Sequence, residues 1–174
     1  MVIGDCLHFA VEFELDHEFG GIWLFGKFCY WVKGKQIGNY NLGTSLRDLL
    51  FQMETIIRDK GKRTNSELFI LDSVELFNRL NDALYSCNSC IYYNKAIEET
   101  WAKFNVTIPV DIFDEWKLFL IEGNEKARII IKMPNSNKII EEELKLEEFD
   151  TVFIEAYKEL NKLYEKEFRK CENS

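Results

Sequence analysis

The chain has 174 residues and a formal net charge of −8 at pH 7. An acidic surface disfavours direct binding to nucleic-acid phosphates, and the longest apolar runs fall far short of the ~20 residues that a membrane span needs. The length and the 47% hydrophobic content predict one domain over 1–174, with a core large enough to be stable without disulfides or bound metals. The N-terminus has no secretory pattern, so we expect a cytoplasmic protein.

The first predicted elements form an antiparallel meander of three strands. Residues 7–15 alternate strictly between apolar and polar side chains, which is typical of a half-buried strand. Residues 22–32 are rich in bulky aromatics and predict a second strand. Residues 36–42 predict a third strand, after a tight turn at residues 33–35. We expect the aromatic side chains of the second strand to lie in the core, which applies to Trp23, Phe25, Phe28 and Trp31.

A helix follows, beginning at Ser45, which has the residue type and position of an N-cap. Its apolar residues recur at helical spacing through residues 46–57. Four basic residues follow the helix. They could bind a phosphate, but we favour the interpretation that their positive charge interacts favourably with the negative end of the helix dipole. These are Arg58, Lys60, Lys62 and Arg63.

The middle of the chain is less regular. Residues 68–71 predict a short edge strand or a buried loop, and Asp72 or Ser73 is expected to cap a second helix. Residues 86–93 predict a loop that carries Cys87, Cys90, Tyr92 and Tyr93.

The remaining elements predict a second antiparallel meander and a long amphipathic helix. The strands are expected at residues 104–110, 116–121, 127–133 and 139–146, and the helix at residues 147–169. The predicted fold class is therefore α+β: antiparallel β-sheets from two meanders, packed by about three helices including the long C-terminal one.

The sequence contains no recognisable catalytic or metal-binding set. Cys87 and Cys90 have the spacing of a zinc half-site, but no second pair of ligands accompanies them. His8 is expected on the solvated face of its strand, which argues against a thiol and base pair with Cys6 or Cys29. There are many carboxylates, but no sequence feature indicates that two of them lie together in a cleft as an acid–base pair. We therefore expect no enzyme, no metal and no cofactor.

Several segments resemble a known family. They are residues 13–31 (FELDHEFGGIWLFGKFCYW), 37–40 (IGNY), 42–48 (LGTSLRD), 58–63 (RDKGKR), 99–104 (ETWAKF) and 108–117 (IPVDIFDEWK). Through them the chain is similar to bacterial toxin immunity proteins, namely immunity family 42 of polymorphic and contact-dependent growth inhibition toxin systems. The resemblance covers nearly the whole chain and rests on strings of structural residues.

The resemblance implies a non-enzymatic protein that binds a cognate toxin domain and blocks it, protecting the producing cell and its siblings. Many such toxins are nucleases, whose substrate-binding surfaces are basic. The net charge of −8 therefore leads us to expect a basic toxin C-terminal domain as partner, with no nucleic acid or membrane, and a monomer or weak homodimer.

Charge and expected exposure suggest where the toxin would be contacted, because loops carry binding more often than packed elements do. The candidates lie in the irregular middle segment and in a loop expected between two strands. They are Tyr92, Tyr93, Glu98, Glu99, Asp111, Asp114 and Glu115. Two alternatives stay open. One is a small-molecule-binding domain or small enzyme with a pocket between sheet and helices, and the other is a scaffold module within a larger complex.

Overall fold

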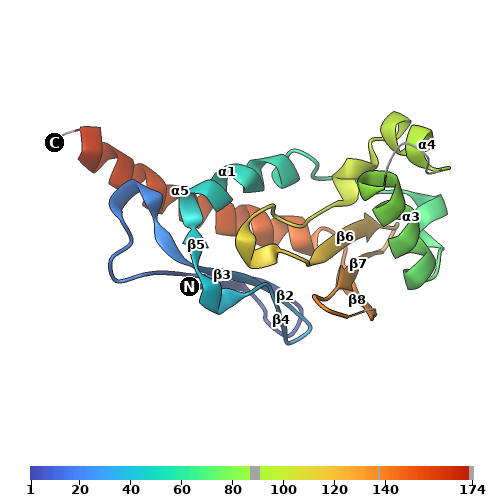
Figure 1. The fold of residues 1–174 in the computed structure, drawn as a ribbon, viewed down its shortest axis with the longest axis horizontal. Coiled ribbons are helices and arrows are strands. Elements are labelled where there is room, and N and C mark those ends of the chain that lie inside the picture. Colours follow the sequence, from blue (N-terminus) through green and yellow to red (C-terminus); the bar gives the residue numbers. More distant parts are fainter. Residues whose placement is uncertain (87–90, 137, 173–174) are drawn as a thin grey trace. The chain divides into compact units, whose positions relative to one another are not determined.

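The computed structural model describes residues 1–86, 91–136 and 138–172 (Figure 1). The chain divides into two compact units. Unit 1 comprises Met1–Arg58, Ile108–Asp114 and Glu147–Ser174, and unit 2 comprises Asp59–Thr107 and Glu115–Leu146. The expectation of a single domain over 1–174 stays a prediction. Among the described residues, no helix combines the length and the apolar character needed to cross a membrane.

Unit 1 is built on a five-stranded antiparallel sheet with β3 paired to three neighbours. In the β2–β3 pair, Val11 lies opposite Tyr30 and Phe13 lies opposite Phe28, so aromatic and β-branched side chains gather on one face. The strands are β1 (Val2–Gly4), β2 (Phe9–Leu15), β3 (Phe25–Val32), β4 (Lys35–Ile37) and β5 (Thr44–Ser45).

Two helices cover this aromatic face, α1 (Leu46–Ile57) and α5 (Glu148–Glu172), and they pack side by side (Figure 1). Tyr30 lies at the centre of the core, with its ring centroid 6.0 Å from that of Phe153 on α5. The predicted cap of α1 is confirmed, because the Ser45 hydroxyl accepts a hydrogen bond from the Asp48 amide at 3.2 Å. The predicted C-terminal helix is also confirmed.

Two predicted strands of unit 1 are shorter than the aromatic pattern indicated. The segment 22–32 enters β3 only at Phe25, after a 3-10 helix η1 (Gly21–Trp23), because Gly20 and Gly21 both adopt positive φ. The segment 36–42 leaves the sheet after Ile37 and forms a second 3-10 helix, η2 (Tyr40–Leu42). Gly38 has φ 101° at that point, which ends the extended conformation.

Unit 2 contains a three-stranded antiparallel sheet in the order β6, β7, β8, which confirms the second meander. One face is covered by short helices whose apolar residues form a single core with Phe119 and Ile130 of the sheet. The elements are α2 (Ser66–Phe69), α3 (Ser73–Tyr85), α4 (Tyr93–Glu98), η3 (Trp101–Phe104), β6 (Lys117–Glu122), β7 (Lys126–Lys132) and β8 (Ile139–Lys145). The α+β class is confirmed, with two antiparallel sheets and five α-helices in the described part of the chain.

Two further predictions are wrong. Residues 104–110 form no strand, because Phe104 ends η3 and Asn105 makes one isolated antiparallel bridge with Phe119. The Val106 amide donates to the Leu118 carbonyl at 3.0 Å, but no continuous ladder follows. The alternating apolar residues of this segment reflect burial, and Pro109 lacks the N–H that a ladder requires. Residues 68–71 belong partly to α2, because the Asn65 side chain caps that helix by accepting from the Leu68 amide at 2.9 Å.

The interpretation of the basic residues after α1 is wrong for Arg63. This side chain is fully buried in unit 2, where its Nε donates to the Lys103 carbonyl at 2.9 Å. The guanidinium therefore joins two segments of unit 2 and does not serve the end of α1. Arg58, by contrast, occupies the C-cap of α1.

Candidate functional site

The α3–α4 side of unit 2 holds the half-buried Tyr92, which immediately precedes α4. The Tyr92 ring stacks on Trp101, with centroids 6.3 Å apart and an interplanar angle of 29°. The Arg79 guanidinium lies 4.6 Å from the Tyr92 ring centroid, within the range of a cation–π contact. These two contacts fix Tyr92 at the protein surface as a rigid aromatic group.

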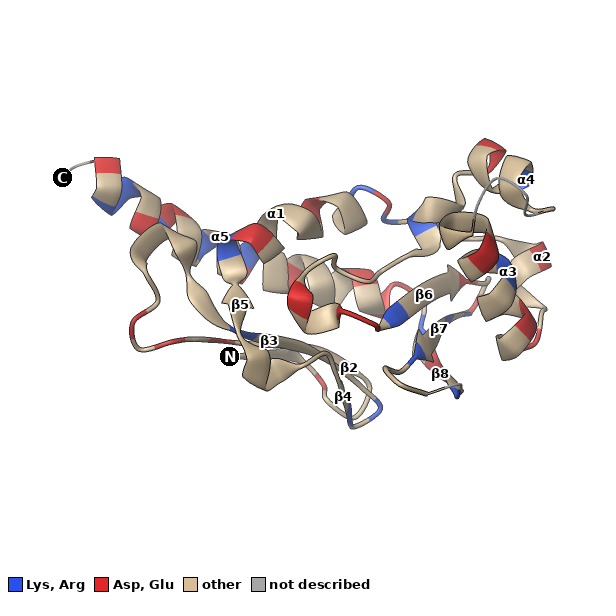
Figure 2. Cartoon of the chain, viewed as in Figure 1, with Lys and Arg blue, Asp and Glu red and all other residues tan. Residues whose placement is uncertain are grey.

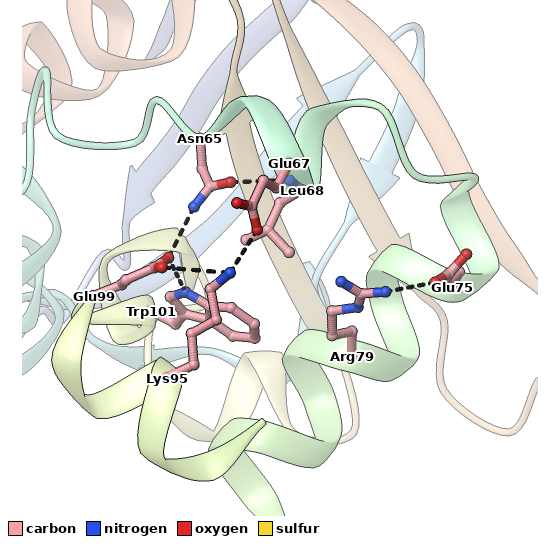
Figure 3. Close-up of polar contacts among 8 residues, drawn as sticks. All are labelled: Asn65, Glu67, Leu68, Glu75, Arg79, Lys95, Glu99 and Trp101. Atoms are coloured by element: carbon pink, nitrogen blue, oxygen red, sulfur yellow. Dashed lines mark hydrogen bonds and ion pairs between the residues drawn. The ribbon is translucent and has the colours of Figure 1, made fainter. Parts of the chain in front are cut away.

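Glu99 is the centre of a polar network that includes Trp101, the residue on which Tyr92 stacks (Figure 3). Its carboxylate accepts from Trp101 Nε1 at 2.8 Å and from Asn65 Nδ2 at 3.1 Å, and it lies 3.6 Å from Lys95 Nζ. Glu67 also pairs with Lys95. The hydrogen bond from Trp101 is the largest influence that lowers the pKa of Glu99, followed by the charge of Lys95.

The lowered pKa of Glu99 predicts a pH-dependent contribution to stability. Because the folded-state pKa lies below the ordinary value of 4.5, the unfolded state binds more protons in that range. The stabilisation is therefore present above about pH 4.5 and is lost as the pH falls through the folded-state pKa. We expect Glu99→Gln to flatten the acid limb of the unfolding free energy, measured by urea denaturation between pH 3 and pH 6. An acid limb as steep as that of the wild type would contradict the assignment.

A groove with a cavity volume of about 370 Å³ lies beside Tyr92 on the outer side of α3. We call it the acidic groove, because three carboxylates and one guanidinium line it. Asp72 also caps α3 through the amides of Val74 and Glu75. Glu75 is paired with Arg79 at 2.6 Å (Figure 3), and Figure 2 shows acidic positions in red on α3. Its lining residues are Asp72, Val74, Glu75, Asn78, Arg79, Asp82 and Tyr92.

The structure brings only part of the sequence-based candidate set together. Tyr92 and Glu99 meet through Trp101, while Tyr93 is half-buried and Glu98 is exposed on α4. The other candidates lie elsewhere along the chain, and the loop expected there is largely a 3-10 helix, η4 (Asp111–Phe113). Asp111 and Asp114 are exposed in unit 1, and Glu115 is exposed at the start of a unit 2 segment with φ 65°. A contact role for all seven stays a prediction.

The thiol groups that the sequence offered for catalysis lie in a setting that keeps them protonated. Cys29 is fully buried, and burial, with a further contribution from Glu12, raises the pKa of its thiol to about 12. His8 was expected on the solvated face of its strand, but it lies in the bend before β2; it is half-buried, with Nδ1 3.5 Å from Lys33 Nζ. Among the residues that the structure describes, no cluster of three or more potential metal ligands occurs. Cys87 and Cys90 lie outside the described residues.

A second cavity of about 370 Å³ lies in unit 2 between α2 and the β6–β7 turn. Phe69 and Ile70 form its apolar wall, and Glu122 and Glu125 contribute carboxylates. The Glu122 amide donates to the Arg63 carbonyl at 2.9 Å, which attaches this turn to the segment before α2. This cavity is one candidate site for the small-molecule alternative, and neither His8 nor Cys29 lines it.

The sequence missed two exposed aromatic residues of unit 1. The expectation of a core position is wrong for Trp23 and Phe25, which are 45% and 44% exposed, whereas Phe28 is buried and Trp31 is half-buried. The available signal was the pair Gly20 and Gly21, whose positive φ values stop the strand early and turn Trp23 away from the core.

An acidic groove beside a surface tyrosine that is held by two neighbouring side chains is the kind of surface that suits binding to another protein. The model of the family described as Immunity protein 42 matches residues 1–159, so the chain belongs to this immunity protein family. It is therefore an immunity protein that neutralises a toxin, as the sequence resemblance implied.

One solved structure supports the fold. The chain is similar to a crystal structure of CdiI from Burkholderia dolosa AUO158, with 18% sequence identity and a TM-score of 0.73. The similarity covers 91% of this chain and 99% of that chain. At this identity the likeness shows a shared fold. A comparison with curated protein sequences gives no match.

Proposed function

We propose that this immunity protein neutralises its toxin by direct contact, and that the acidic groove binds a basic surface of the toxin. The observation that carries the proposal is the groove itself, in which three carboxylates surround one guanidinium beside the fixed ring of Tyr92. A concave surface can enclose protruding lysine and arginine side chains, which a flat surface cannot.

Two physical effects support this role. The ring of Tyr92 is already held by Arg79 and Trp101, so little side-chain entropy is lost when a partner covers it. The carboxylates, together with the net charge of −8, would attract a basic domain over several ångströms and raise its association rate. Tyrosine and arginine are also common among residues that dominate binding energy.

The expected toxin class is a nuclease. A nuclease that binds phosphates presents a positively charged surface, and an acidic inhibitor can occupy the place of those phosphates. The inhibitor then needs no catalytic group, which agrees with the non-enzymatic role that family membership implies. A cytoplasmic site of action is part of this proposal.

Neutralising the groove should weaken the complex. We expect the double variant Glu75→Gln and Asp82→Asn to lower the affinity for the toxin domain about 10-fold, mostly through a slower association rate. The measurement is surface plasmon resonance with the C-terminal domain of the toxin encoded beside this gene. Asp72 is left intact, because its side chain caps α3.

The double variant Glu54→Gln and Glu155→Gln is the matched control, since it removes the same charge from exposed positions of unit 1. Equal losses in both variants would mean that only net charge matters, and an unchanged affinity in the groove variant would refute the groove as the contact surface.

A further inference from the structure

Unit 1 carries a strip of aromatic side chains, of which Trp23, Phe25, Phe51 and Phe168 are exposed and Tyr164 is half-buried. Trp23 and Phe25 lie parallel, with ring centroids 6.3 Å apart and an interplanar angle of 3°. The Arg47 guanidinium lies 3.6 Å from the Trp23 ring centroid and 2.8 Å from the Asp48 carboxylate. We call the following set the aromatic strip: Trp23, Phe25, Arg47, Phe51, Tyr164 and Phe168.

The strip continues from η1 along α1 and onto α5, the two helices that run side by side in Figure 1. Phe51 lies one helical turn after Arg47, and its ring meets that of Tyr164 edge-on with centroids 5.5 Å apart. The Tyr164 ring is in turn 5.9 Å from that of Phe168. Phe51 and Phe168 are 45% and 42% exposed, so the apolar surface extends well beyond Trp23.

The backbone before β3 is held in a conformation that keeps Trp23 outside. Leu24 is fully buried and has φ 51°, a left-handed conformation that residues other than glycine rarely adopt. Its carbonyl accepts from the Leu46 amide at 3.1 Å, and the Trp23 carbonyl accepts from the Ser45 hydroxyl at 3.1 Å. Burying Leu24 therefore fixes both neighbouring aromatic side chains on the outer side of unit 1.

Acidic residues border the Trp23 end of the strip. The Asp16 amide donates to the Phe25 carbonyl at 3.0 Å, and the Phe25 amide donates to the Phe19 carbonyl at 2.8 Å, which holds the loop of residues 16–19 beside Phe25. Asp16, Glu18 and Asp48 are all exposed. An apolar surface of this kind, bordered by carboxylates, is complementary to an apolar protrusion flanked by lysine or arginine.

We propose that the aromatic strip is a second binding surface, separate from the acidic groove, and that its occupant is the basic toxin domain. The inference rests on the proposed function. Large exposed apolar patches mark interaction sites, and tryptophan and arginine are the residue types that most often dominate binding energy. A second copy of the chain fits less well, because it would bring another net charge of −8 to an acidic border.

The test uses Trp23→Ala and, separately, Phe51→Ala in the full chain, with calorimetric titration of the toxin domain encoded beside this gene. We expect Trp23→Ala to raise the Kd about 30-fold or more, the effect of losing a dominant interface residue. Phe51→Ala should raise the Kd about 5-fold. Leu7→Ala is the control, because Leu7 is 72% exposed in the same unit but lies outside the strip. Circular dichroism checks that each variant is folded.

The possible outcomes separate the two proposals. Weaker binding in both strip variants, with Leu7→Ala unchanged, supports the strip. Wild-type affinity in both strip variants overturns the strip and leaves the proposed function intact. Absence of binding by the wild-type protein overturns both. If light scattering detects a dimer that Trp23→Ala dissociates while toxin affinity is unchanged, the occupant is a second copy and the proposal is wrong.

Discussion

Replacing Trp101 with alanine is expected to lower the free energy of unfolding by about 4 kcal/mol, a value typical of a large aromatic removed from a core. Trp101 is only 1% exposed and belongs to the core of unit 2 together with Phe104 and Phe119. Its removal would leave a cavity that the short helices around it can fill only in part. Urea denaturation measures the loss.

The same variant tests how the candidate surface is supported. Trp101 stacks on Tyr92 and donates to Glu99, so the alanine variant should also free Tyr92 and weaken toxin binding. Trp101→Phe is the matched comparison, because it keeps a buried ring but loses the Nε1 donor. We expect it to cost about 2 kcal/mol. A loss below about 1 kcal/mol for Trp101→Ala would contradict the place of this residue in the core.

Replacing Tyr30 with alanine should destabilise unit 1 by a similar amount, about 4 kcal/mol. The Tyr30 ring is fully buried at the centre of an aromatic cluster, with centroid distances of 4.9 Å to Phe113 and 5.8 Å to Phe9. Such ring pairs add stabilisation beyond the area they bury. Thermal and urea denaturation give the measured loss.

Tyr30→Phe separates the ring from the hydroxyl group. We expect this variant to cost about 1 kcal/mol, because the ring contacts survive and only the hydrogen-bonding group is removed. Equal losses for the phenylalanine and alanine variants would assign the stabilisation to the hydroxyl and refute the packing argument.

The elements that the sequence predicted well have strong local patterns. The alternation of residues 7–15 corresponds to β2, and the apolar stripes of residues 46–57 and 147–169 correspond to α1 and α5. The period of 3.6 residues accounts for the buried apolar side chains of α1 and α5, whereas β2 departs from strict alternation because Ala10 is also fully buried. Asp72 also proved to be the N-cap of α3, because its carboxylate accepts from two amides of the first turn.

The failures come from tertiary contacts that no local pattern encodes. Phe104, Val106 and Ile108 alternate like a strand and are all buried, yet they form no strand. The segment meets β6 through one isolated bridge and the hydrogen bond of the Val106 amide, without a continuous ladder. Arg63 stood in a run of basic residues, but its Nε donates to the distant Lys103 carbonyl. Trp23 stands in an aromatic segment typical of a core strand, but the left-handed backbone around it places its side chain outside the core.

The candidate site was predictable only in part. Tyr92 and Glu99 could be selected as surface residues, but their link through Trp101 depends on the packing of α4 and η3 against α3. The acidic groove joins residues of α3 to Tyr92, which lies after residues 87–90 in the sequence. Carboxylate spacing alone could not indicate that concave surface.

The most direct test of the account is calorimetric titration of the purified toxin domain with this protein at two salt concentrations. Raising the ionic strength from about 0.01 M to about 0.1 M shortens the Debye length from ~30 Å to ~10 Å, which screens exposed charges but spares buried apolar contacts. We predict a one-to-one complex that weakens at the higher salt concentration and keeps a salt-resistant component from the aromatic strip. Absence of binding at both salt concentrations would contradict neutralisation by direct contact.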